Sequence, residues 1–380
     1  MANTFLVPKK IISGKDAMHA AVPFLCGNGR KPLIVTDPTM IKLDILKKLT
    51  DQLDMEYAVW SGIEHEPDDT MIKQGAEEYQ KNACDSLIAL GGGSAIDSMK
   101  AIGLMIHQDH PLSWFMGKQI QCNMPHMSAI PTTAGTGSEA TKFTIINDTS
   151  SKVKMLLTGE CLIPDLAVID PQFTMTAPKN VTAATGIDAL CHCTEAYTSR
   201  KAQPLSDTFA LSAAKRIFAN LRTCYNEPKN ENARIQMSLA ATEAGISFNN
   251  SSVTIVHGMS RPIGALFHIA HGLSNAILLE ECMRFVIDGA YDRFGEMSRS
   301  LGFSASMNDK EASEAFLAQE AQLLKDLDIP SMSQLGIDRR VYEENIPKMA
   351  RDAFASGSPS NTIKDIRVED MENLYRKIYR

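Results

Sequence analysis

The first 170 residues of this 380-residue chain alternate short apolar runs with amphipathic segments. Three runs have the composition of buried strands: residues 33–36, 57–60 and 86–90. Two segments repeat apolar side chains at helical spacing, residues 41–49 and 96–106, and a polar helix is expected at about residues 70–81. Strands joined by helices pair in parallel, because each helix must cross over one face of the sheet. The alternation therefore predicts an open α/β sheet that is covered on both faces.

The pattern changes near Thr174, where strand signals almost disappear. Long amphipathic stretches rich in Ala, Leu, Glu and Met follow: residues 203–219, 230–247 and 311–327. Pro178 and Pro330 are typical of helix boundaries. The length also favours two or three domains at roughly 150 residues each. We therefore expect a Rossmann-like α/β domain over residues 1–175 and an all-helical domain over residues 176–380.

Composition narrows the class of protein. Lys and Arg number 38 against 45 Asp and Glu, a net charge of -7, which argues against an electrostatic nucleic-acid binder. The eight cysteines are too sparse for the disulfide framework of a small secreted domain. We find neither a leader peptide at the N-terminus nor the roughly 18 uninterrupted apolar residues of a membrane span. These features predict a reduced, cytoplasmic enzyme without a membrane or nucleic-acid partner.

A glycine loop joins the third predicted strand to the helix that follows. Its residues are Gly91, Gly92, Gly93 and Ser94. Glycines let the backbone approach a bound group closely, and a helix N-terminus offers unpaired N–H donors. The loop predicts a phosphate or pyrophosphate site, although a plain turn fits it equally well. It departs from the G-x-G-x-x-G pattern, because Ser94-Ala95-Ile96 replaces the later glycine.

Two further features fit the same nucleotide site. Residues 130–139 form a polar loop after a strand-like run, with Thr132, Thr133 and Thr136 able to wrap a ribose or phosphate. A solvated turn is the alternative for this loop taken alone. Asp37 ends the first predicted strand, where a carboxylate can bind ribose hydroxyls and repel a 2′-phosphate. This predicts NAD rather than NADP, but an Asx turn with Pro38 explains Asp37 equally well.

A carboxylate and several histidines form a candidate metal set. Asp188 and His192 stand at i and i+4 of a helical segment and so project from one face. His257, His268 and His271 follow in an apolar region that is interrupted by glycines. One carboxylate with two or three imidazoles suits a divalent metal. The alternatives are satisfied core histidines and a surface Asp–His contact.

The order of these motifs resembles that of the iron-containing (group III) alcohol dehydrogenase family. The motifs are Asp37 and residues 91–97, 131–139, 186–192 and 257–276. The resemblance covers essentially the whole chain. It implies the dehydroquinate synthase-like fold of that family, with catalysis in the cleft between the two domains. It also implies an NAD(H)- and metal-dependent alcohol dehydrogenase or aldehyde reductase that assembles as a homodimer or larger homo-oligomer.

The resemblance also assigns roles to residues. The metal, Fe2+ in many members and Zn2+ in some, would be held by Asp188, His192, His257 and His271. The cofactor residues would be Asp37, Gly91, Gly92, Gly93, Ser94, Asp97, Thr132, Thr133, Thr136 and Lys154, the last at the nicotinamide ribose. The substrate pocket would be lined by Phe143, Ile145, Phe248, Val253 and Phe354. Such an apolar pocket suits a short aldehyde or primary alcohol.

Arg261 departs from the family pattern, in which many members carry a histidine four residues after the residue that matches His257. Arginine stays protonated and is a poor general acid or base. His268, or water with the ribose hydroxyls, would then relay the proton. We also consider that Arg261 pairs with a substrate carboxylate or sulfonate. A structural carboxylate that holds Arg261 away from the substrate is an equal alternative.

Two other functions deserve comparison. NAD- and metal-using cyclases of the dehydroquinate synthase type are lyases that need a basic pocket for a polyanionic phosphate. The sparse Lys and Arg around the metal motifs do not favour that activity. A metal-stabilised binding protein would bind nucleotide without turnover. The sequence therefore favours the dehydrogenase.

Overall fold

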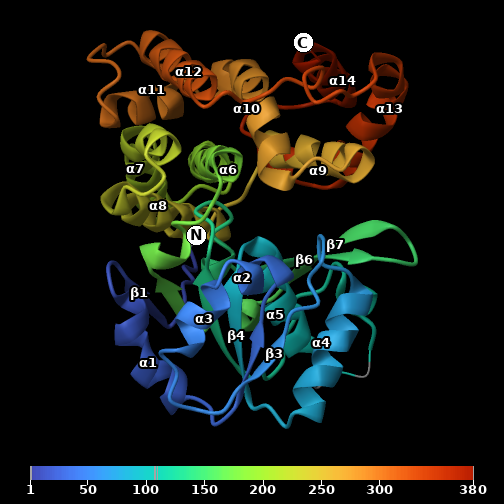
Figure 1. The fold of residues 1–380 in the computed structure, drawn as a ribbon. Helices are drawn as coiled ribbons and strands as arrows, with labels where there is room; N and C mark the ends of the chain where they lie inside the picture. Colours follow the sequence, from blue (N-terminus) through green and yellow to red (C-terminus); the bar gives the residue numbers. More distant parts are fainter. Residues whose placement is uncertain (1, 107, 109, 380) are drawn as a thin grey trace. The chain divides into compact units, whose positions relative to one another are not determined.

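The computed structural model describes residues 2–106, 108 and 110–379, so His107, for which the sequence favours a surface or capping role, lies outside the described residues (Figure 1). The chain divides into two compact units, Leu6–Ala177 and Pro178–Arg380 with Met1–Phe5. The predicted boundary at residues 175 and 176 lies two residues before this division. The grouping of the N-terminal residues with the second unit was not predicted. It arises because Phe5 stacks on Phe209 at 5.7 Å and Gln203 Nε2 donates to the Thr4 carbonyl.

The α/β unit is built on a six-stranded sheet in which every pair of strands is parallel. The strand order is β1 (Lys10–Ser13), β8 (Leu166–Ile169), β5 (His126–Pro131), β4 (Ser86–Gly91), β2 (Pro32–Val35) and β3 (Ala58–Trp60). The main helices are α1 (Ala17–Gly27), α4 (Asp69–Lys81) and α5 (Gly93–Met105). The predicted open parallel sheet is confirmed.

Alternation along the strands sends side chains into two separate cores. Leu33 and Val35 of β2 join one core, which includes Met99 of α5. Ile34 of the same strand joins the other core, which includes Met18 of α1. Helices therefore cover both faces of the sheet, and the carboxyl ends of its strands are left to carry loops.

Two details of this unit differ from the expectation. The helix expected over residues 41–49 is broken at Asp44, whose φ is 58°, into α2 (Pro38–Lys42) and α3 (Ile45–Thr50). An antiparallel hairpin of β6 (Phe143–Asp148) and β7 (Val153–Thr158) was not predicted. Its turn is stabilised locally, since the Asp148 carboxylate accepts hydrogen bonds from Ser150 and Ser151.

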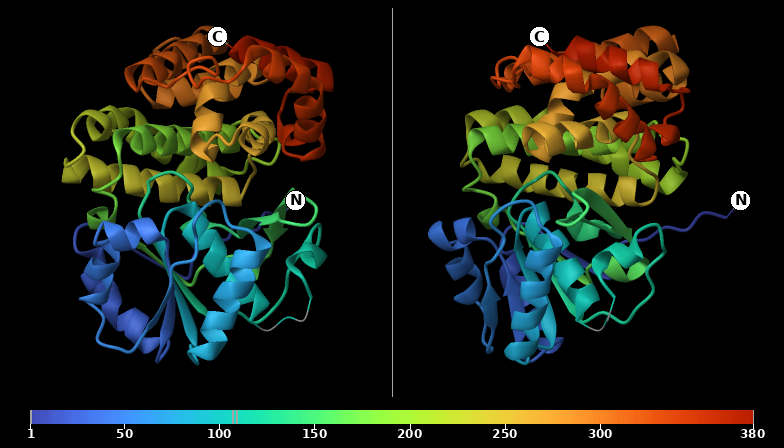
Figure 2. Two further views of the ribbon diagram at one scale, coloured as in Figure 1. Left: turned by 45° about the vertical axis from the view of Figure 1, so that its right-hand side comes forward. Right: turned by 90° about the vertical axis from the view of Figure 1, so that its right-hand side faces the viewer.

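The second unit is helical, and its described residues form no strand element. Its helices are α6 (Lys179–Tyr197), α7 (Pro204–Asn226), α8 (Glu231–Asn249), α9 (Ile255–Phe267), α10 (His271–Val286), α11 (Tyr291–Ser300), α12 (Asp309–Asp326), α13 (Arg339–Ala355) and α14 (Val368–Ile378). Helix α6 is buried along most of its length and packs against α7, α8 and α10. Figure 2 shows α6, α7 and α8, coloured green to yellow, running side by side.

Most of the cysteines that the structure describes are free and buried. Five free thiols are buried within the described part of the chain: Cys84, Cys191, Cys193, Cys224 and Cys282. Cys191 and Cys193, on either side of His192, are therefore core residues. None of the described helices has the length and apolar character that crossing a membrane requires.

Candidate metal centre and nucleotide site

Four side chains of the helical unit meet as the predicted metal ligands. Asp188 and His192 lie one turn apart on α6, and α9 brings His257 beside them. Their ligand atoms all lie within 4.8 Å of one another, and all three residues are buried. His271, the first residue of α10, is half-buried with its Nε2 3.9 Å from Asp188 Oδ1. The helices thus bring together one carboxylate and three imidazoles.

Asn275 lies at the point where these ligand atoms converge. Its Nδ2 donates to Asp188 Oδ1 at 2.6 Å and lies 3.1 Å from His257 Nε2 and 3.3 Å from His271 Nε2. One amide nitrogen therefore faces the lone pairs of a carboxylate and two imidazoles. A divalent cation is bound by that same convergence of lone pairs. The residues present fit a metal such as iron or zinc.

The charges of the cluster suit metal binding. Burial would raise the pKa of the Asp188 carboxyl, but the neighbouring histidines hold it below its ordinary value. Burial lowers the pKa of His192 to about 3. Burial also opposes charge on His257, yet Glu195 and Asp188 raise its pKa to about 9. The Asp188 carboxylate is thus favoured in its anionic form and His192 in its neutral form, and a bound metal would take the place of any proton on His257 Nε2.

Glu195 orients His257 and was missed in the sequence. Its Oε2 accepts a hydrogen bond from His257 Nδ1, and its Oε1 accepts bonds from Thr254 Oγ1 and Val256 N, both at 2.7 Å. The bond to Nδ1 leaves Nε2 free to face Asp188. The signal was present in the sequence: Asp188, His192 and Glu195 stand at i, i+4 and i+7, on one face of a helix.

The predicted nucleotide residues meet in the α/β unit at the carboxyl ends of its strands. Going along the chain, strand order reverses between β2 and β4, the place where open α/β sheets bind ligands. Asp37 follows β2, and the glycine loop follows β4. Asp37 Oδ1 accepts hydrogen bonds from Thr39 N and Met40 N, so Asp37 forms the expected Asx turn with Pro38 and caps α2. Oδ2 is left without a hydrogen bond to any residue that the structure describes, so capping does not exclude a ribose contact.

The glycine and threonine loops are in contact. Thr132 N donates to the Gly91 carbonyl at 3.0 Å. A Cβ on Gly92 would lie 3.4 Å from Thr133 Oγ1, and one on Gly93 would lie 2.8 Å from Thr136 Cγ2. Gly92 begins α5 without a side-chain cap, and Ser94 is half-buried in its first turn. Bare N–H donors beside threonine hydroxyls fit a pyrophosphate.

Two predicted cofactor residues make contacts inside the α/β unit. Asp97 Oδ2 accepts a hydrogen bond from Ile145 N at 3.0 Å, which ties β6 to α5. Lys154 on β7 forms an ion pair with Glu66, with 2.6 Å between Nζ and Oε2. The predicted pocket residues Phe143 and Ile145 are half-buried on β6. Asp97 thus positions the strand that carries two predicted pocket residues. Its nucleotide contact stays a prediction, as does that of Lys154.

The other candidates lie in the helical unit. Phe248 stacks on His192 with 4.3 Å between ring centroids, so it borders the metal ligands. Val253 is half-buried, and its carbonyl accepts a hydrogen bond from Asn361. Phe354 is 48% exposed on α13. His268 is also exposed, with a left-handed φ of 53° just after α9.

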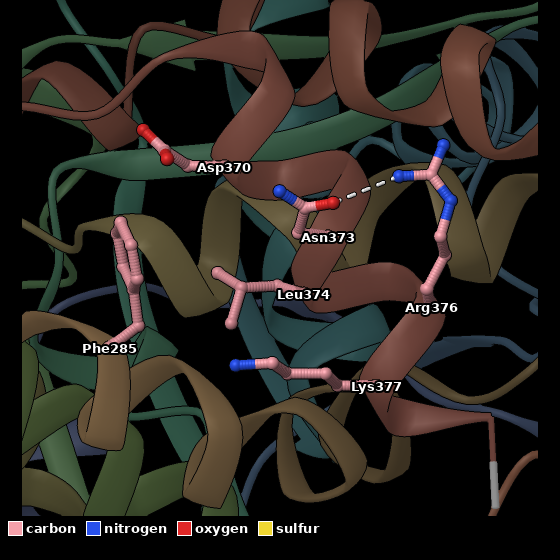
Figure 3. A pocket seen from close by; sticks show the side chains of 6 residues that line it. All are labelled: Phe285, Asp370, Asn373, Leu374, Arg376 and Lys377. Carbon is pink, nitrogen blue, oxygen red and sulfur yellow. Dashed lines mark hydrogen bonds between the residues drawn. The ribbon is translucent and has the colours of Figure 1, made fainter.

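Two hollows of the described surface lie away from these candidate residues. One has a volume of about 420 Å³ and lies beside α14. Figure 3 shows the residues that line it: Phe285, Asp370, Asn373, Leu374, Arg376 and Lys377. Arg376 in this hollow is hydrogen-bonded to Asn373 and paired with Glu372. A second hollow involves residues 227–230. Neither contains a candidate site residue, so we place no function there.

Comparison with known proteins decides the family. Residues 8–171 match the model described as iron-containing alcohol dehydrogenase, and residues 182–379 match the C-terminal model of the Fe-containing alcohol dehydrogenase family. The chain belongs to the iron-containing alcohol dehydrogenase family. It is 32% identical to lactaldehyde reductase of Escherichia coli (strain K12) over 99% of both chains. The fold matches a crystal structure of 1,3-propanediol oxidoreductase with a TM-score of 0.95 at 30% identity, covering both chains fully.

A third relative carries its cofactor. The structure of sulfoacetaldehyde reductase from Bifidobacterium kashiwanohense in complex with NAD+ matches with a TM-score of 0.89 at 27% identity, over 100% of this chain and 99% of that one. Family membership confirms the predicted fold and activity. The protein is an oxidoreductase that acts on CH–OH donors, interconverting alcohol and aldehyde with a metal and NAD. The cyclase alternative is not favoured.

Proposed function

We propose that this protein reduces a short aldehyde to its primary alcohol with NADH, or catalyses the reverse reaction. The observation that carries the proposal is the convergence of Asp188, His257 and His271 on the Asn275 amide, with His192 alongside. Relatives named for lactaldehyde, 1,3-propanediol and sulfoacetaldehyde support a substrate of two or three carbons. Iron is the metal we expect, and zinc suits the same ligands.

The reaction consumes an aldehyde, NADH and a proton and yields an alcohol and NAD+. When bound, the metal supplies a Lewis acid for the substrate oxygen, and the nicotinamide supplies the hydride. The protein's part is to hold and orient both partners. Phe248, stacked on His192, provides an apolar wall that excludes water. We infer that Phe143, Ile145, Val253 and Phe354 complete the pocket.

The cofactor is held, in this proposal, by the α/β unit. The free N–H groups of the glycine loop bind the pyrophosphate, and the threonine loop lines it. The free Oδ2 of Asp37 accepts from the adenosine ribose hydroxyls and disfavours NADP. Lys154 binds the nicotinamide ribose. His268, or water with the ribose hydroxyls, delivers the proton to the substrate oxygen, because the Arg261 guanidinium does not release a proton.

The test is NADH oxidation with short aldehydes after the metal-free protein is reloaded with Fe2+ or Zn2+. We expect His257→Ala to lose both bound metal and activity while keeping its helical circular dichroism. His19→Ala removes an exposed histidine of α1 and serves as the matched control. A His257→Ala variant that holds stoichiometric metal and stays active would contradict the proposal. The homodimer and the cytoplasmic location stay predictions, the first open to light scattering.

A further inference from the structure

Arg261 is a half-buried cation on α9. It makes no hydrogen bond and no salt bridge to any residue that the structure describes. Other buried or half-buried arginines of the helical unit are satisfied: Arg216 pairs with Glu243, Arg293 pairs with Asp207, and Arg234 donates to the Pro228 carbonyl. Burying a charged group without compensation is costly. A guanidinium left in this state is suited to an anion that comes from outside the protein.

Arg261 lies on the face of α9 that also carries His257. Arg261 follows His257 by four residues on α9, so both side chains leave the helix on the same face. Glu195 acts on Arg261 electrostatically, but it forms no ion pair with it. Both Glu195 oxygens are already used by His257, Thr254 and Val256. The alternative of a structural carboxylate therefore finds no support among the described residues.

The spacing along the helix limits the size of the ligand. Four residues of α-helix rise about 6 Å, which separates the backbone positions of His257 and Arg261. An aldehyde oxygen and an acid group on one short carbon skeleton can reach two side chains that are one helical turn apart. A guanidinium offers two parallel N–H donors that match a carboxylate or a sulfonate. One unpaired arginine suits a monoanion better than a polyphosphate.

We propose that Arg261 binds a carboxylate or sulfonate at the far end of the substrate, and that the substrates are short aldehydes carrying such an acid group. This inference rests on the proposed function, and it adds the substrate class. Arg261 is then a specificity residue that fixes the anionic end while the aldehyde end faces the metal ligands.

The test compares matched pairs of aldehydes with the metal-loaded enzyme. 3-Oxopropanoate is paired with 3-methylbutanal, and sulfoacetaldehyde is paired with 3,3-dimethylbutanal, so that each pair differs mainly in charge. We expect the wild-type enzyme to have a higher kcat/KM for the anionic aldehyde in at least one pair. Comparison of the two pairs then shows whether a carboxylate or a sulfonate is preferred. Arg261→Gln should lower the ratio of kcat/KM, anionic over neutral, by at least about tenfold. Arg261→Lys keeps the positive charge but loses the two parallel N–H donors. Its kcat/KM ratio should therefore lie between those of wild type and Arg261→Gln.

Arg340→Gln is the matched control, because Arg340 is an exposed arginine of α13 whose loss changes the net charge equally. An unchanged ratio in Arg261→Gln overturns the inference. Absence of NADH oxidation with all four aldehydes in wild type instead overturns the proposed function, and the inference with it. Inhibition of 3-methylbutanal reduction by ethanesulfonate and propanoate gives a second readout should Arg261→Gln fold poorly. If neither ethanesulfonate nor propanoate inhibits the wild-type enzyme, the inference is also overturned.

Discussion

Glu195 is the residue on which the orientation of His257 depends. Its two oxygens bind three hydrogens, from Thr254, Val256 and the Nδ1 of His257. Such a carboxylate fixes the tautomer of a metal-binding histidine and raises its basicity. The metal centre therefore includes a group that does not touch the metal.

We predict that Glu195→Gln weakens metal binding by about 10- to 100-fold. The glutamine oxygen must accept from Thr254 and Val256, so the amide NH2 faces His257 Nδ1. His257 must then accept there and carry its proton on Nε2, the nitrogen needed for the metal. Competition with a chromophoric chelator measures the affinity, and Glu344→Gln on exposed α13 is the control. Equal affinity in Glu195→Gln and wild type would show that Glu195 does not fix the tautomer.

Residue spacing in the sequence predicted much of this centre. The i and i+4 spacing of Asp188 and His192 placed both on one face of a helix, and the structure joins His257 to them. The same spacing also places Glu195 on that face of α6, but the bond of Glu195 to His257 and the contacts of Asn275 could not be predicted in this way. Their contacts depend on how α9 and α10 pack against α6, which spacing within one helix does not determine.

Among the elements, the glycine loop and the threonine loop act as a pair. The sequence predicted the strand, the loop and the helix after it, because apolar runs and glycines punctuate the chain there. It did not predict the β6–β7 hairpin or the break at Asp44, since both depend on local turns rather than on apolar periodicity. Contact between the two loops leaves little room for a side chain at Gly93.

We predict that Gly93→Ala weakens NADH binding about tenfold, because the new methyl group would lie 2.8 Å from Thr136 Cγ2. Adding Thr136→Ser removes that carbon and keeps the hydroxyl, so the double variant should recover most of the affinity. Titration of NADH fluorescence measures both constants, with Thr136→Ser alone as the reference. Wild-type affinity in Gly93→Ala would mean that the loops separate without cost.

At the scale of the whole molecule, stability depends on a buried acid far along the chain from the ligands. Glu320 of α12 is fully buried, and neither of its oxygens has a partner among the described residues. Burial, with Glu280 nearby, raises the pKa of Glu320 to about 8. The folded protein thus holds this proton at pH values where the unfolded chain, near its ordinary 4.5, has lost it.

We predict that stability falls as pH rises between these two pKa values. The unfolded state binds fewer protons there, so this group removes about 1.4 kcal/mol from the free energy of unfolding per pH unit. Glu320→Gln mimics the protonated acid and removes this dependence. Its Tm relative to wild type should therefore rise from about pH 5 to about pH 8. A constant difference, as expected for the exposed control Glu344→Gln, would refute the shifted pKa.

The buried thiols give this chain a set of internal probes. Cys191 and Cys193 flank His192 in the core of α6, and Cys84 is buried in the other unit. A thiol reagent reaches such sulfurs only when the surrounding structure opens. The rate of labelling at Cys84 therefore measures how often the α/β unit opens. The rate at Cys191 and Cys193 measures the same for the helical unit. Cys191 and Cys193, on either side of the ligand His192, should therefore react with the reagent only when the metal centre unfolds.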